Sequence, residues 1–255
     1  MPENDGNLRF DFSGQRVVVT GGTRGIGAAT TRAFLTAGAT VHATYRSDDT
    51  AAEAMRETCG EDSERLSLHR FDLTDFAAVE NFWNELDESA PEGVQVLVNN
   101  AGIRRDGVLA MMSPEDWSGV IDANLTSGFA MSKFAVMNMM RQRYGRILFL
   151  TSPAGRFGFE GQGNYSASKA GQVGLARSLS KETAKRGITV NCVSPGFIGT
   201  DLLSDLPDEQ VKAYKKTIPL RRFGATEEIA TACMFLASRE ASYITGETLE
   251  VSGGL

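Results

Sequence analysis

The segment Val17–Gly27 reads VVVTGGTRGIG, and it decides the predicted fold. Its three valines indicate a buried strand, its glycines a turn, and helical spacing begins at Gly25. Glycine lets the backbone approach a bulky anion, and a helix N-terminus offers free N–H groups and a positive dipole end. This strand-loop-helix context favours a phosphate-binding loop over an ordinary turn, although Gly-x-x-x-Gly-x-Gly differs from the common Gly-x-Gly-x-x-Gly pattern.

Strands and helices alternate along the rest of the chain. The predicted strands are Arg16–Thr20, Thr40–Tyr45, Arg65–Arg70, Val94–Asn99, Gly145–Thr151, Ile188–Ser194 and Thr248–Val251. The predicted helices are Gly25–Ala37, Thr50–Cys59, Asp75–Ser89, Ser113–Met140, Asn164–Arg186 and Thr226–Ala237. The alternation predicts an α/β protein with a doubly wound parallel seven-stranded sheet and helices on both faces. We expect a tail over residues 1–13, one domain over 14–255, and a lid over about 195–222.

Composition excludes several classes of function. A formal charge of −6 disfavours nucleic-acid binding, and no window approaches the roughly 20 apolar residues of a membrane span. The start, MPENDGNLRF, lacks a secretory pattern, so we expect a cytoplasmic protein. No metal site is expected from its few cysteines and histidines, which are Cys59, Cys192, Cys233, His42 and His69.

Arginines near the first two strands indicate which nucleotide the crevice takes. At the end of the second strand, where an NAD enzyme of this architecture places an acid on the ribose 2′-hydroxyl, the chain has Arg46. With Arg24 of the glycine loop it can bind a 2′-phosphate, which favours NADP(H) over NAD(H). The alternative is that both arginines are solvated, with Asp48 and Asp49 pairing with Arg46.

The next two strands end in residues that suit the same crevice. Asp72 and Leu73 offer an acceptor and an apolar neighbour for adenine. After the fourth strand, Asn99-Asn100-Ala101-Gly102 is small and polar where the sheet edge must touch a cofactor. An ordinary turn also favours Asn and Gly, so position at the strand end is the deciding argument.

Tyr165 and Lys169 lie four positions apart in a helical segment and share a face. An ammonium beside a phenol favours the phenolate, so we expect Lys169 to lower the pKa of Tyr165 and permit proton donation to a carbonyl. Ser152 closes the fifth strand and is expected to meet the same oxygen, with Thr151 as the rival hydroxyl and Pro153 altering the turn. Without this context, a Tyr-Lys pair is ordinary helix surface.

Asn124 lies within the long predicted helix that precedes the fifth strand. It can bind water and link Lys169 to solvent for proton return, or it can be a polar residue of a helix interior.

These motifs together resemble the short-chain dehydrogenase/reductase family, from about Gly14 to Gly254. The motifs are TGGTRGIG, NNAG, Asn124, Ser152, Tyr-x-x-x-Lys and Pro195-Gly196, in the family's order. The resemblance implies a Rossmann fold, hydride transfer from nicotinamide and an Asn-Ser-Tyr-Lys tetrad, in which Lys169 also binds the nicotinamide ribose. The expected cofactor contacts are Gly21, Thr23, Arg24, Gly25, Ile26, Gly27, Arg46, Asp72, Leu73, Asn99, Ala101, Gly102, Tyr165, Lys169, Pro195, Gly196, Ile198 and Thr200.

Within that family the segments NNAGIRRDGVLAMM, GQGNYSASKAG and ASYITGETLEVSGG look like those of bacterial 3-oxoacyl-[acyl-carrier-protein] reductases. That likeness implies NADPH-dependent reduction of a carrier-bound 3-oxoacyl thioester in fatty-acid or polyketide-type biosynthesis. It places Arg143 and Arg186 where the subgroup docks its acidic acyl carrier protein. It also implies a homotetramer or homodimer, to whose interface Met131, Met137, Met139 and Met140 beside Phe134 are suited unless they are core residues.

Three alternatives stay open. The same fold can reduce a free ketone, a sugar or a specialised-metabolite intermediate. A non-catalytic dinucleotide-binding protein is disfavoured because all four tetrad members are present. An enoyl reductase of the superfamily is disfavoured because those enzymes have a Tyr-Lys pair with six intervening residues, whereas Tyr165 and Lys169 have three.

Overall fold

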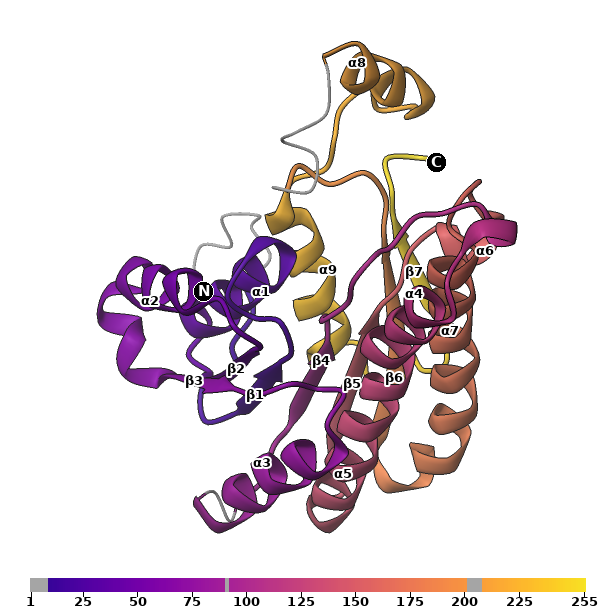
Figure 1. The fold of residues 1–255 in the computed structure, drawn as a ribbon. Coiled ribbons are helices and arrows are strands. Elements are labelled where there is room, and N and C mark those ends of the chain that lie inside the picture. The colour runs from indigo at the N-terminus through magenta and orange to yellow at the C-terminus, as the bar shows by residue number, and fades with distance from the viewer. Residues whose placement is uncertain (1–8, 90–91, 201–207) are drawn as a thin grey trace.

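The structure, a computed structural model, describes residues 9–89, 92–200 and 208–255. All strand pairs are parallel, and the sheet order is β3-β2-β1-β4-β5-β6-β7 (Figure 1). The strands are β1 (Arg16–Val19), β2 (Thr40–Tyr45), β3 (Leu66–Arg70), β4 (Val96–Asn99), β5 (Gly145–Leu150), β6 (Ile188–Pro195) and β7 (Thr248–Val251). The prediction of a doubly wound parallel sheet with a Rossmann-type topology is confirmed.

Helices cover both faces of the sheet. Its first core contains side chains of α1 (Gly25–Thr36), α2 (Asp49–Thr58) and α9 (Thr226–Ala237). Its second core contains those of α3 (Phe76–Ser89), α5 (Ser127–Gln142) and α7 (Gly163–Thr183). Successive side chains of a strand point to opposite faces of the sheet. In β1, Val17 and Val19 accordingly belong to the first core and Val18 to the second, so both faces of the strand are covered.

Two phenylalanines within the expected tail of residues 1–13 belong to the first core, since Phe12 is buried in it and Phe10 packs against it. Phe12 is buried and its ring packs edge-on against Phe34 of α1, with centroids 4.8 Å apart. Its backbone N–H donates to the carbonyl of Ala37 at 2.7 Å. The tail therefore contributes apolar burial from at least Phe12, and residues 1–8 of it lie outside the described part.

The long helix expected over Ser113–Met140 is divided into three parts. They are α4 (Pro114–Ile121), a π-helical turn η3 (Asp122–Thr126) and α5. A π turn contains one extra residue and so displaces the side chains and carbonyls of its turn from regular helical positions. Asn124 lies in this turn and is buried, so the interruption coincides with a predicted catalytic residue.

Short elements complete the architecture. They are η1 (Gly60–Arg65), η2 (Leu109–Met111), α6 (Ala154–Phe157), η4 (Ala184–Arg186) and α8 (Asp208–Thr217). Helix α8 stands beyond the end of the sheet at which β7 ends (Figure 1). It belongs to the expected lid and contacts the strand end through Tyr214, whose ring stacks on Phe197 with centroids 4.8 Å apart. Residues 201–207 of that lid lie outside the described part.

Three further observations concern metals, membranes and thiols. In residues 9–89, 92–200 and 208–255, no group of three or more His, Cys, Asp or Glu side chains is placed to hold a metal ion. Within the same residues, every helix is too short or too polar to cross a bilayer. The three cysteines are free thiols.

Candidate active site

The glycine loop between β1 and α1 is built around a close backbone approach. Gly21 and Gly25 have φ of 62° and 53°, in the left-handed region that favours glycine. A Cβ on Gly27 would overlap the carbonyl oxygen of Gly21, so the first turn of α1 lies directly on the loop. The loop therefore needs glycine at these positions.

Thr20 and Asn100 bind this loop to the end of β4. The Thr20 hydroxyl accepts hydrogen bonds from the backbone N–H groups of Asn100 and Ala101, both at 3.0 Å. The Asn100 side chain donates to the carbonyls of Thr20 and Gly21, at 2.9 and 3.1 Å. Neither residue was among the predicted site residues, although both stand in the quoted motifs. They join β1 to β4 where the strand order reverses, which is where open α/β sheets bind ligands.

The N-terminus of α1 has the free donors that a nucleotide pyrophosphate needs. No side chain caps it, and its first turn contains no acidic residue. Uncapped N–H groups at a helix N-terminus form a ready anion site. Gly102 lies close to the predicted catalytic residues, since a Cβ there would lie 3.0 Å from Asn124 Oδ1 and 3.6 Å from Lys169 Nζ. The residues present therefore fit a dinucleotide.

The acids near Arg46 are engaged elsewhere. Asp48 caps α2 by accepting from the Ala51 N–H at 2.9 Å, and Asp49 pairs with Arg70 at 2.9 Å. Within the described residues, neither acid forms an ion pair with Arg46, which is exposed. The proposed competition for Arg46 is therefore absent from this arrangement, and its guanidinium can meet a phosphate.

The residues expected around adenosine differ in burial and in how many of their polar atoms have partners within the protein. Hydrogen bonds from Thr74 and the charge of Arg46 outweigh burial and lower the pKa of Asp72. One Asp72 oxygen accepts from the Thr74 backbone and hydroxyl, at 2.9 and 2.8 Å. Asn99 is buried and donates to the Ser132 hydroxyl at 3.0 Å, while its Oδ1 has no protein partner. Leu73 packs against the second core. Asp72 thus keeps acceptor capacity for a ligand, whereas the Asn99 Oδ1 is enclosed by protein.

Tyr165, Ser152 and Lys169 come together at the carboxyl ends of β5 and β6. Ser152 follows β5, and its hydroxyl lies close enough to the Tyr165 phenol to favour the phenolate. The Lys169 ammonium lies 5.5 Å from the centre of the Tyr165 ring and donates to the Leu150 carbonyl at 2.6 Å. The rival Thr151 is buried, and its hydroxyl donates to the Val193 carbonyl at 3.2 Å. The geometry therefore favours Ser152 as the hydroxyl beside Tyr165.

Pro153 begins the short helix α6 rather than distorting the site. It precedes Ala154, whose N–H donates to the Ser152 hydroxyl oxygen at 3.2 Å. Proline is tolerated at a helix start because its missing N–H would have no intrahelical partner there. The turn thus holds Ser152 in place.

The pKa of Tyr165 differs from the expectation. Burial raises it above its ordinary value, and neither the hydrogen bond with Ser152 nor the charge of Arg104 reverses that direction. Burial also lowers the pKa of Lys169 to about 8. The predicted lowering of the Tyr165 pKa is therefore wrong in direction, because desolvation has the largest influence on the phenol.

Both polar atoms of the Asn124 side-chain amide are hydrogen-bonded within the protein. Its Oδ1 accepts from the Ile103 N–H at 2.7 Å, and its Nδ2 donates to the Ile103 carbonyl and to the Ser168 hydroxyl, both at 3.0 Å. Its backbone carbonyl accepts from Gln172 at 2.8 Å. The side chain therefore positions the loop after β4 instead of standing free for water. Ser168 and Gln172 share the helix face of Tyr165, and that shared face is the signal that sequence reasoning missed.

The residues after β6 reach the glycine loop. Gly196 donates to the Val251 carbonyl at 3.0 Å and follows Pro195, the last residue of β6. A Cβ on Gly25 would lie 3.7 Å from the Thr200 methyl group, so Thr200 stands over the loop. Ile198 is buried in the first core, and its carbonyl accepts from the Thr200 N–H at 2.8 Å.

Comparisons with known proteins agree with this geometry. A family model described as enoyl-(acyl carrier protein) reductase matches residues 21–255. The 3-oxoacyl-[acyl-carrier-protein] reductase FabG of Escherichia coli (strain K12) is 44% identical over 246 residues, covering 96% of this chain and 99% of that protein. The chain belongs to the short-chain dehydrogenase/reductase family. FabG of Vibrio harveyi is 43% identical, with 96% and 99% coverage, and nodulation protein G of Rhizobium sp. (strain N33) is 42% identical, with 96% and 98% coverage.

In this short-chain dehydrogenase/reductase, Arg143 and Arg186 lie at the opposite end of the sheet from Tyr165. Arg143 ends α5 before β5 starts, and Arg186 ends η4 before β6 starts. They are close together, since Arg143 donates to the Lys185 carbonyl at 3.4 Å. A carrier protein docked on them would therefore not reach Tyr165 of the same chain directly.

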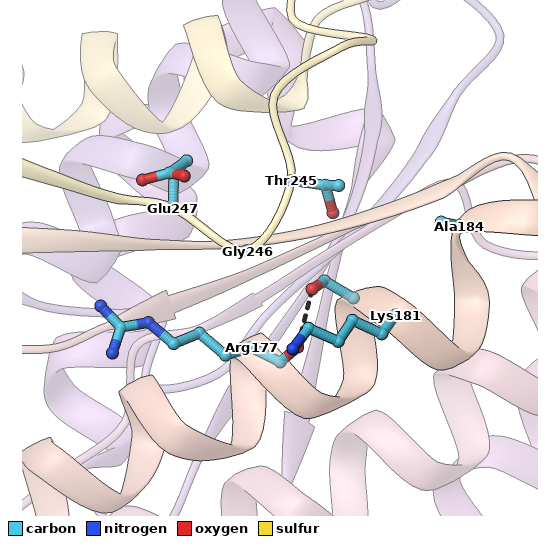
Figure 2. Close-up of a pocket in the computed structure, with 7 residues that line it drawn as sticks. Arg177, Lys181, Ala184, Thr245, Gly246 and Glu247 are labelled. Atoms are coloured by element: carbon cyan, nitrogen blue, oxygen red, sulfur yellow. Dashed lines mark hydrogen bonds between the residues drawn. The ribbon is translucent and has the colours of Figure 1, made fainter.

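A hollow of about 380 Å³ lies between α7 and the loop before β7 (Figure 2). Arg177, Lys181 and Glu247 line it, and its only drawn hydrogen bond joins Ser180 to the Arg177 carbonyl. Because it opens at the start of β7, it is separate from the crevice at the strand ends. We assign it no role in this family's chemistry.

Proposed function

We propose that the protein reduces a 3-oxoacyl thioester, bound to an acyl carrier protein, to the 3-hydroxyacyl thioester with NADPH. One observation carries the proposal: Ser152, Tyr165 and Lys169 meet at the strand ends that also hold the glycine loop. Similarity to carrier-protein reductases supports the substrate class. The family model's description names an enoyl reductase, so reduction of a carbon-carbon double bond is the competing activity.

The cofactor would be held along the crevice. The α1 N-terminus and glycine loop would bind the pyrophosphate, Arg24 and Arg46 the 2′-phosphate, Asp72 the adenine and Asn99 the adenine ribose. Lys169 and the backbone after Pro195 would bind the nicotinamide half. When bound, NADPH supplies the hydride for the 3-keto carbon.

The chain's own residues would handle the proton. The hydroxyl of Ser152 donates a hydrogen bond to the keto oxygen and holds it beside Tyr165. Because burial raises the pKa of Tyr165, its phenol stays protonated at neutral pH and can donate from Oη to that oxygen. The resulting phenolate is stabilised by the Lys169 ammonium and by the nearby Ser152 hydroxyl. Asn124 holds the Ile103 loop against the site.

Docking and assembly are proposed from the resemblance. Arg143 and Arg186 would bind the acidic carrier protein, and their position at the far end of the sheet requires another chain's crevice to receive the acyl group. A homodimer or homotetramer would supply it. Met137 and Met140 of α5 are exposed and suit such an interface, whereas Met131, Met139 and Phe134 belong to the core.

A substrate panel tests the proposed function. With NADPH we expect kcat/KM for a 3-oxoacyl thioester on acyl carrier protein to exceed that for a 2-enoyl thioester or a free ketone by at least about a hundredfold. NADH should be used about tenfold less well, since it lacks the phosphate for Arg24 and Arg46. The measurement is NADPH or NADH oxidation at 340 nm. Preference for the enoyl thioester or the free ketone would contradict the proposal.

A further inference from the structure

One buried glutamine of α7 bonds to the backbone of a tetrad member. Gln172 is 1% exposed, and its side-chain Nε2 donates to the backbone carbonyl of Asn124 at 2.8 Å. Its Oε1 is also buried and has no hydrogen-bond partner among the described residues. A buried amide oxygen without a partner costs free energy, whereas an apolar side chain of the same length avoids that cost. Stability alone therefore does not favour glutamine at this position.

The carbonyl that Gln172 binds belongs to the π-helical turn η3. Asn124 is the middle residue of this turn, which closes with a hydrogen bond from the Ser127 N–H to the Asp122 carbonyl. A π turn moves its carbonyls away from the positions that a regular helix gives them. Gln172 binds one of these carbonyls from a neighbouring helix, so its amide connects the backbone of η3 to α7.

The turn and α7 also pack closely at this level. A Cβ on Gly171, next to Gln172, would lie 2.7 Å from Cδ2 of Leu125, next to Asn124. The two helical segments therefore need a glycine at their contact. Because Asn124 and Gln172 are both 1% exposed, bulk water is not available to replace the amide as a donor to the Asn124 carbonyl.

The side chain of Asn124 links the position of this turn to the reactive groups. It bonds to both backbone polar groups of Ile103, which follows β4 and Gly102. A Cβ on Gly102 would lie 3.0 Å from Asn124 Oδ1 and 3.6 Å from Lys169 Nζ. A shift of the turn would therefore move the backbone that lies beside the Lys169 ammonium.

We propose that Gln172 is a positioning residue for the reduction, which holds the Asn124 carbonyl and thereby the loop after β4 beside Lys169. The inference deepens the proposed function and rests on reduction at Tyr165 and Lys169 as proposed there. Because Gln172 acts through Asn124 and not on a substrate, its loss should reduce kcat and leave KM and NADPH affinity nearly unchanged. A displacement of about 1 Å at reacting groups can cost about a hundredfold in rate.

The first test variant, Gln172→Met, keeps the length of the side chain and removes its donor. We expect kcat to fall about tenfold at every pH between about 5.5 and 8, with KM and the NADPH Kd changed less than about twofold. Gln142→Met is the matched control, because Gln142 donates to the Val94 carbonyl at 3.3 Å, at the opposite end of the sheet from Tyr165. It should change kcat less than about twofold.

The second test variant, Gln172→Glu, distinguishes a donated hydrogen bond from packing. Burial raises the pKa of a carboxyl group, so the new side chain is protonated at low pH and can donate from its O–H to the Asn124 carbonyl, whereas the carboxylate cannot donate. We expect kcat within about threefold of wild type at about pH 5.5, and about tenfold lower relative to wild type once the carboxyl has ionised. The free energy of unfolding of this variant, relative to wild type, should fall as pH rises and level off above that pKa, which locates it independently.

Two results would overturn the inference. One is a kcat of Gln172→Met equal to that of wild type, and the other is a kcat of Gln172→Glu that stays low and constant relative to wild type while its carboxyl titrates. If Gln172→Met does not fold, the pH profile of Gln172→Glu decides. All assays use the panel substrate that wild type reduces fastest. If that substrate is not the 3-oxoacyl thioester, the proposed function is contradicted, while the variants still test the role of Gln172.

Discussion

Replacing Tyr165 with phenylalanine is expected to lower kcat for the 3-oxoacyl thioester by about a thousandfold or more. The phenol is the proposed proton donor, and a positioned general acid contributes about 10²–10⁴-fold. The ring of Phe fills the same space, so NADPH should bind within about threefold of wild type, since no binding determinant of the phosphates is altered. Single-turnover NADPH oxidation measures the first effect and fluorescence titration of NADPH the second.

Tyr243→Phe is the matched control for this substitution. Tyr243 is fully exposed and lies in the loop between α9 and β7. Loss of its hydroxyl should leave kcat unchanged. Retention of more than about a tenth of wild-type kcat by Tyr165→Phe would remove the phenol from the proposed chemistry.

Replacing Lys169 with methionine is expected to reduce activity and raise stability together. Loss of the ammonium removes the charge that stabilises the Tyr165 phenolate, and we expect kcat to fall about a hundredfold or more. The buried ammonium is costly, as its pKa of about 8 shows. Methionine has similar length and no charge, so the free energy of unfolding at pH 7 should rise on the order of 2 kcal/mol.

The pKa of Lys169 determines how its effect on the free energy of unfolding changes with pH. The folded-state pKa of Lys169, about 8, lies below its ordinary value of 10.5, so folding disfavours the charged form. The cost is fully present below pH 8 and disappears as pH rises through 10.5. The stability difference between wild type and Lys169→Met should therefore shrink between pH 8 and 10.5. Reduction by wild type should decline as pH rises past about 8, where the ammonium is lost.

Chemical denaturation at several pH values, with kcat measured beside it, tests this prediction. Lys181→Met provides the control, because Lys181 is an exposed lysine on the same helix. It should alter neither stability nor kcat appreciably. A Lys169→Met protein that is less stable than wild type at pH 7 would contradict the desolvation argument.

Strand placement could be predicted well because a parallel sheet covered on both faces needs nearly continuous apolar runs. Strands β5 and β6 are buried along their whole lengths and were predicted to within one residue at each end. The π turn at Asn124 could not be predicted, because one inserted residue leaves the apolar pattern of Ser113–Met140 nearly unchanged. The packing of Phe12 on Phe34 is a contact between the chain start and α1, which local patterns do not report.

In the candidate site, too, features set by local sequence could be predicted, whereas features set by contacts between distant segments could not. Spacing alone places Tyr165 and Lys169 on one helix face, and the structure brings them to the strand ends with Ser152. The direction of the Tyr165 pKa shift could not be predicted, because it depends on how far the fold buries the phenol. Asn100 was expected only as one of the small polar residues that follow the fourth strand, and its bonds to the glycine loop depend on β4 lying beside β1.

The most direct test is a crystal structure of the protein with NADP⁺ bound. We predict the pyrophosphate at the α1 N-terminus, the 2′-phosphate between Arg24 and Arg46, and the nicotinamide against Tyr165 and Lys169. A dinucleotide bound elsewhere, or a nicotinamide out of reach of the Tyr165 hydroxyl, would contradict the account.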